Sequence, residues 1–133
     1  MKKDIDLPEV KDVGIAIIPE SENGITHWFV YIINFRSDDI SHVIIASSGY
    51  GVIDGRKKET TVLRYHLDHL EAGSYRKLEY ILEDAFQLTN QFWVSFYEGS
   101  TLFDKKFIFV PESIHELNLV MIPVVEQRGV IIR

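Results

Sequence analysis

The sequence contains no cysteine among its 133 residues. This absence excludes disulfide bonds, thiolate metal sites and cysteine nucleophiles, and a small domain that folds without disulfides suits the cytosol. A long apolar run is also missing, because no apolar core follows the basic start of MKKDIDLPEV and no stretch approaches membrane-spanning length. We therefore expect a cytoplasmic protein without a signal peptide and without a membrane partner.

Positive charge is scarce as well. The chain has 14 Lys and Arg residues against 20 Asp and Glu residues, a net charge of −6. Nucleic-acid affinity comes largely from basic side chains that neutralise phosphates, so a nucleic-acid partner is not expected. The motifs G-x-G-x-x-G, G-x-x-x-x-G-K-[ST] and G-x-S-x-G are absent too. We therefore expect that the protein is not an enzyme and that it has no catalytic residue and no cofactor.

Apolar and aromatic residues are abundant. The hydrophobic fraction is 46%, and eight Phe, six Tyr and two Trp are present. So much apolar surface collapses into a folded core, and this length suits one domain. We expect a single domain over residues 1–133, with a loose lead-in at 1–11 and an apolar C-terminal tail at 112–133 that docks on the rest.

Alternating apolar and polar residues predict short β-strands separated by turns. The longest β-favouring run is Trp28 to Phe35, which is apolar on both faces and reads as a central strand. Asn34 interrupts this run, and its amide should bond to a nearby backbone turn. Further strands are expected at 13–19, 40–47, 60–68, 92–97 and 101–110. The strands at 28–36 and 40–47 are expected to pair as a hairpin.

Residues 74–86 fit either a helix or a strand. A helix would place Arg76 and Lys77 in its first turn and Glu83 and Asp84 near its end, against the helix dipole at both ends, so we favour a strand. A strand separates two sets of side chains: Leu78, Tyr80 and Leu82 point inward, and Lys77, Glu79 and Glu83 point outward. The acids then face water, which does not favour a glycosidase-like carboxylate pair.

The segments VYIINFRSDDISHVII, LDHLEAGSYRKLEYI and FWVSFYEGSTLFDKKFIFV occur in this order. Their arrangement resembles immunoglobulin-like sandwiches of the bacterial adhesive and fibronectin type III kind. The resemblance implies an all-β, antiparallel two-sheet immunoglobulin-like sandwich of about seven strands. The whole chain also resembles a family of small bacterial proteins without an established function. Some members are labelled phenylalanyl-tRNA synthetase alpha subunit, but this chain is too short for that catalytic domain and lacks its arginine-bearing motifs.

One candidate ligand site is the glycine-rich and basic segment 47–58. Amides exposed by glycine together with cationic side chains bind phosphate or carboxylate groups. This hypothesis predicts an anion, small-ligand or RNA-associated site, and the ordinary alternative is a flexible hairpin with a soluble tip. The candidate anion-binding residues are Ser48, Gly49, Gly51, Arg56, Lys57 and Lys58.

A second cluster, His66, Asp68 and His69, contains possible metal ligands. In a strand, His66 and Asp68 share one face while His69 points the other way, so the three converge only at a bend. The structural interpretation is that the first two lie on a solvated face and His69 begins a turn. We therefore expect no metal site here.

The aromatic excess points to an interaction surface. Exposed aromatic clusters mark association surfaces, where Tyr and Trp contribute most of the energy. The candidate interaction residues are Phe29, Tyr31, Trp93, Tyr97 and Phe107. The alternative is that residues 117–132 fold back and cover the aromatics. Our first hypothesis is a non-enzymatic module that binds a protein partner or a second copy of itself.

Overall fold

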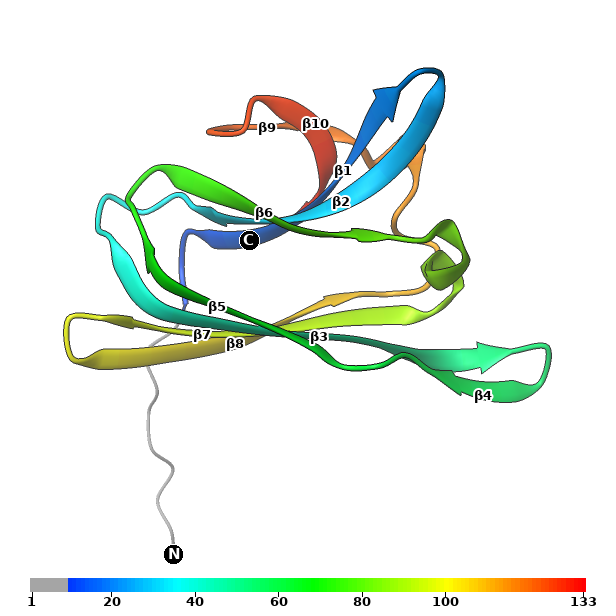
Figure 1. Ribbon diagram of the computed structural model, residues 1–133, viewed down its shortest axis with the longest axis horizontal. Helices are drawn as coiled ribbons and strands as arrows, with labels where there is room; N and C mark the ends of the chain where they lie inside the picture. The colour runs from blue at the N-terminus through cyan, green and yellow to red at the C-terminus, as the bar shows by residue number, and fades with distance from the viewer. Residues whose placement is uncertain (1–9) are drawn as a thin grey trace, which may run out of the picture.

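The computed structural model describes residues 10–133, which form two antiparallel β-sheets packed face to face (Figure 1). Sheet A consists, in spatial order, of β6 (Ser74–Ile81), β2 (Ile25–Asn34), β1 (Val13–Glu22), β10 (Gln127–Ile132) and β9 (Val120–Ile122). Sheet B consists of β4 (Arg56–Glu59), β3 (Ile40–Ile53), β7 (Thr89–Glu98) and β8 (Thr101–Phe109), with β5 (Leu63–Leu70) also paired to β3. Residues 10–133 also contain two 3₁₀ helices, η1 (Glu83–Gln87) and η2 (Glu116–Asn118).

The predicted all-β sandwich is confirmed, although the described residues form ten strands instead of about seven. Residues 1–9 of the expected lead-in lie outside the described part, and Val10 is buried in the core. Within residues 10–133, no helix has the length and apolar character needed to cross a bilayer.

Strand β2 has both faces covered, as its composition predicts. Its Val30 and Ile32 belong to the core between the sheets, while Tyr31 and Ile33 belong to a second cluster on the outer face of sheet A. The predicted hairpin with residues 40–47 is wrong, because β2 pairs β1 and β6 whereas β3 lies in sheet B. Residues 35–39 form a corner between the sheets, and Asn34 bonds to its backbone as predicted.

The C-terminal segment covers the outer face of sheet A. Strand β10 pairs with β1 and so extends sheet A, and β9, which precedes β10 in the chain, pairs with β10. The turn between β9 and β10 folds over the outer face of the sheet. Ile122 and Val125 are buried against Ala16, Ile18 and Tyr31. Figure 1 shows this segment in orange and red above the sheet. A sheet with apolar residues on both faces needs this second cover.

The segment at 47–58 forms a β-hairpin, which is the ordinary alternative to a ligand-binding loop. Strand β3 continues to Ile53, turns at Asp54 and Gly55, and returns as β4. The turn residues have φ values of 53° and 75°, the conformation of a two-residue hairpin turn.

Residues 74–81 form strand β6, which agrees with the favoured interpretation, but residues 83–86 of the expected strand belong to the 3₁₀ helix η1. A β-bulge shifts the register, since Tyr31 pairs Lys77 but Val30 pairs Glu79, so Leu78 is the extra residue. The predicted facing is therefore wrong beyond this point. Glu79 points into the sandwich, and Tyr80 and Leu82 are exposed.

Candidate functional site

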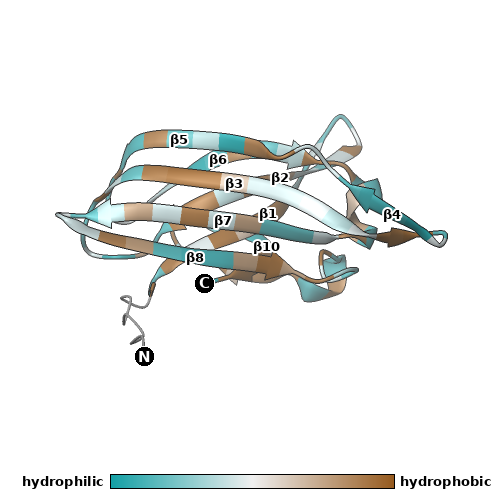
Figure 2. Cartoon of the chain, turned by 90° about the horizontal axis from the view of Figure 1, so that it is seen from below, coloured by the Kyte–Doolittle hydropathy of each residue, from teal (hydrophilic) through white to brown (hydrophobic). Residues whose placement is uncertain are grey.

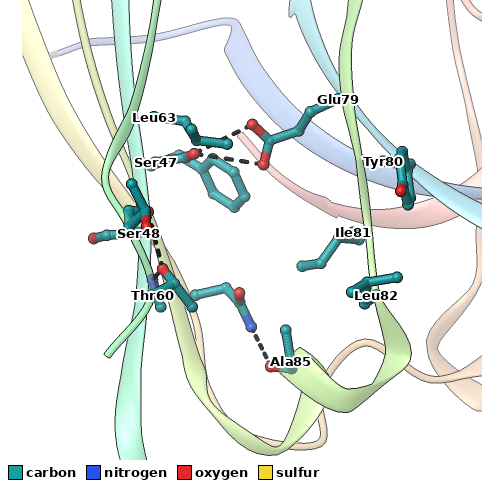
Figure 3. Close-up of a pocket in the computed structure, with 13 residues that line it drawn as sticks. Ser47, Ser48, Thr60, Leu63, Glu79, Tyr80, Ile81, Leu82 and Ala85 are labelled. Atoms are coloured by element: carbon teal, nitrogen blue, oxygen red, sulfur yellow. Dashed lines mark hydrogen bonds between the residues drawn. The ribbon is translucent and has the colours of Figure 1, made fainter. Parts of the chain in front are cut away.

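A cavity of about 270 Å³ opens where the free edges of the two sheets separate, between β5 and β6 (Figure 3). Strand β6 is the edge strand of sheet A, and β5 is an edge strand of sheet B on the same side of the sandwich. Ala85 of η1 lines one end of the cavity. Its lining is mainly apolar. The lining residues are Ser47, Ser48, Gly49, Thr60, Thr61, Leu63, Glu79, Tyr80, Ile81, Leu82, Ala85, Asn90 and Phe92.

The Glu79 carboxylate is the charged group of this cavity. The bulge turns it inward, where it accepts a hydrogen bond from Ser47 Oγ at 3.3 Å and another from the Tyr65 hydroxyl. Burial, and then the hydrogen bond to Glu79, raises the pKa of Tyr65, so this phenol stays a donor. Within residues 10–133, no Lys, Arg or His forms an ion pair with Glu79.

Glu20 provides an internal comparison. It also accepts a hydrogen bond from a tyrosine, Tyr31, but Lys77 Nζ lies 2.9 Å from its Oε1. Burial alone would raise the pKa of Glu20, whereas hydrogen bonds from Tyr31 and Lys77 lower it below its usual value. The two carboxylates thus differ in that Glu20 has a cationic partner among the described residues and Glu79 does not.

Asn90 contributes an acceptor to the same cavity. The side chain is 5% exposed, and its Nδ2 donates to the carbonyl oxygens of Ala85 at 2.9 Å and Leu88 at 3.3 Å. Both donor hydrogens are therefore used, while Oδ1 has no donor partner among the described residues. The polar groups of the cavity thus offer acceptors to a ligand.

The candidate anion-binding residues lie on the β3–β4 ribbon. Gly49 N donates to Thr60 Oγ1 at 2.7 Å, and Gly51 pairs Lys58 across the ribbon, so these residues belong to the sheet ladder and form no glycine cradle. Ser48 pairs Gln91 of β7. Arg56, Lys57 and Lys58 are exposed on β4, on alternating sides of the strand.

The five candidate interaction residues do not share one surface. Tyr31 is 2% exposed and Phe107 is 0% exposed, and Phe29 is half-buried beside Lys77 on the outer face of sheet A. Trp93 and Tyr97 are exposed on the outer face of sheet B. Alternation along β8 turns Phe107 inward, and the C-terminal segment covers Tyr31.

Trp93 and Tyr97 belong to a larger exposed surface on the outer side of sheet B, which we call the sheet B face. Figure 2 views the molecule from the side of sheet B. Trp93 is 46% exposed and Ile44 is 45% exposed on neighbouring strands. Lys106 Nζ lies 4.6 Å from the Trp93 ring centroid. The sheet B face comprises Ile44, Ala46, Arg64, His66, Trp93, Ser95, Tyr97, Leu102, Asp104, Lys106 and Ile108.

The histidine cluster is divided. His66 Nδ1 lies 3.7 Å from Asp68 Oδ1, while His69 Nε2 lies 3.2 Å from Asp39 Oδ2 at the corner between the sheets. Residues 10–133 contain no group of three side chains placed to hold a metal ion.

No protein-family model, curated protein or solved structure matches this chain. The candidate site is therefore assigned from the geometry of its own residues. Sequence reasoning missed Glu79 and Asn90 as cavity residues and Tyr65 as a hydrogen-bond partner of Glu79. Regular alternation placed Glu79 on the outer, polar face of its strand, and no motif marks a bulge at Leu78.

Proposed function

We propose that this chain is a non-enzymatic β-sandwich module that binds a second copy of itself through the sheet B face. The observation that carries the proposal is the difference between the two outer faces. The chain's own C-terminal segment covers the central part of the outer face of sheet A, whereas Trp93, Ile44 and Tyr97 of sheet B are left exposed on adjacent strands. Exposed apolar residues grouped in this way mark association surfaces.

The arrangement of the side chains favours a second copy as the partner. Strand pairing aligns two rows across the face. One row is Ala46, Trp93 and Lys106, and the neighbouring row is Ile44, Ser95 and Asp104. Consider a two-fold axis that lies in the interface, between the rows and perpendicular to the strands. It places the first row of one copy over the second row of the other.

This placement is complementary in size and charge. Trp93 meets the small Ser95, Ile44 meets Ala46, and Lys106 meets Asp104, each pair occurring twice because a two-fold interface repeats its contacts. Opposite charges at matched positions fix the register of such an interface. A single surface that complements itself supports a symmetric dimer over an unrelated partner.

The test is the molar mass in solution, measured by light scattering over a range of concentrations. We expect Lys106→Asp and Asp104→Lys each to shift the chain to monomer, and the double variant to restore the dimer with reversed charges. Leu117→Ser is the matched control, because Leu117 is exposed outside this face. A wild-type chain that stays monomeric at all concentrations would overturn the proposal.

We further propose that the sandwich is of the immunoglobulin-like type, in a cytosolic protein. Support comes from the order of the strands: β1, β2 and β6 are neighbours in one sheet, and β5, β3, β7 and β8 are neighbours in the other. These orders match the A, B and E strands and the strands around C, F and G of immunoglobulin-like folds. Anion or RNA binding by Arg56, Lys57 and Lys58 ranks second, supported by their exposure alone.

A further inference from the structure

The Glu79 cavity contains a charge without a counter-charge. Its half-buried carboxylate points into the cavity and is held by two neutral hydroxyls, those of Ser47 and Tyr65. A carboxylate that has lost part of its hydration is stabilised when a positive group lies beside it. Glu20, the comparable carboxylate on sheet A, has Lys77 for this purpose. In residues 10–133, Glu79 has no such partner.

The surroundings of Glu79 are suited to an apolar body. Ile81 and Phe92 line the interior of the cavity, and the exposed Leu63 and Leu82 lie among its lining. Figure 3 shows Leu63 and Leu82 on opposite sides of the opening, one on each sheet edge. Exposed leucines beside a concave site provide apolar contact area for a ligand.

The volume limits the size of the ligand. A cavity of roughly 150 Å³ accommodates a benzene molecule. The present cavity of about 270 Å³ therefore accommodates one ring, or a short alkyl chain, with a small polar arm.

We propose that this cavity binds a small primary ammonium ion with an apolar ring or chain. The ammonium group bonds to the Glu79 carboxylate, and the apolar part lies against Ile81 and Phe92. An ammonium group has three donor hydrogens and no acceptor, which suits a cavity that offers acceptors. The site is separate from the sheet B face and does not depend on dimer formation.

The direct experiment is calorimetric titration of the full chain at neutral pH with three probes of similar shape: benzylammonium, benzyl alcohol and benzoate. We expect benzylammonium to bind about tenfold more tightly than benzyl alcohol, as one hydrogen bond to a charged group predicts. Benzoate is expected to bind most weakly because Glu79 repels it. Equal affinity for the three probes, or no binding of benzylammonium, would overturn the proposal.

Variants assign the binding to this cavity. Glu79→Gln should weaken benzylammonium binding about tenfold and leave benzyl alcohol binding unchanged. Glu20→Gln is the matched control, since it removes the other tyrosine-bonded carboxylate and should change neither. Ala85→Leu adds carbon atoms within the cavity, keeps the carboxylate, and should abolish binding of both ligands. Undiminished binding by Ala85→Leu would contradict the proposal even if Glu79→Gln failed to fold.

Discussion

Asn34 connects three segments at one end of the sandwich. Its Nδ2 lies 3.0 Å from the carbonyl oxygen of Asp38 and 3.1 Å from those of Leu70 and Glu71. Its Oδ1 accepts from Arg36 N at 2.9 Å. The side chain is fully buried, so no water replaces these bonds. One amide thus holds the corner after β2 against the turn that joins β5 to β6.

Replacing Asn34 by aspartate tests this role. An aspartate accepts hydrogen bonds but does not donate to three carbonyl oxygens, so Asn34→Asp should lower the free energy of unfolding by about 2–4 kcal/mol. Urea unfolding measures the change. Asn118→Asp is the control, because Asn118 is exposed and donates to a single carbonyl, that of Ser113. A loss below about 0.5 kcal/mol for Asn34→Asp would contradict the assignment.

At the scale of elements, strand β10 packs unusually close to its neighbours at Gly129. A Cβ atom at this position would lie 2.7 Å from Ile18 Cγ1, 2.9 Å from Ile122 Cδ1 and 3.0 Å from the carbonyl oxygen of Ile17. The third contact is with backbone, which does not move aside as the end of a side chain can. Glycine at this position therefore allows β10 to lie against β1 while the C-terminal segment folds over sheet A.

We accordingly expect Gly129→Ala to destabilise the protein by about 1–3 kcal/mol, the usual effect of overpacking. Thermal and denaturant unfolding would measure it. Gly99→Asn serves as control, since Gly99 has a φ of 62° with open space around it and asparagine tolerates that conformation. Equal stability of wild type and Gly129→Ala would show that the strands separate at little cost.

At the scale of the whole molecule, the stability of the fold at alkaline pH depends on the hydroxyls of the buried Tyr31 and the half-buried Tyr65. Burial first, and then hydrogen bonds to Glu20 and Glu79, raise the pKa values of Tyr31 and Tyr65 above the ordinary value of 10.0. The Tyr65 bond joins β5 of sheet B to β6 of sheet A, so it contributes to holding the sheets together.

The sign of the pH effect follows from these raised pKa values. The folded state keeps both protons after the unfolded state begins to lose them, so the stabilisation is complete below about pH 10 and declines above it. We expect the free energy of unfolding to fall with rising pH in this range. The decline should be shallower for Tyr31→Phe/Tyr65→Phe, as measured by denaturant titrations at a series of pH values. An identical slope in the double variant would contradict this account.

The sequence by itself determined most of the strands, most of the turns and the local role of Asn34, but not β4, β9 and β10. Alternation along Trp28 to Phe35 and along 92–110 identifies strands because side chains of an extended chain point to opposite faces. Asp54-Gly55 identifies its turn because both residues accept a positive φ. The preference for a strand over residues 74–86, which is right for 74–81, rested on unfavourable charge positions in a helix. All these signals are local.

Only the tertiary structure decided which strands are partners and which faces are covered. Strands β2 and β3 lie in different sheets although the connection between them is short. The apolar residues of both strands are buried between the sheets because the chain crosses from one layer to the other at residues 35–39. The bulge at Leu78 turned Glu79 inward, and the return of residues 120–132 buried Tyr31 while the sheet B face stayed exposed. These outcomes depend on contacts between segments far apart in the chain, and alternation along one strand carries no information about its distant neighbours.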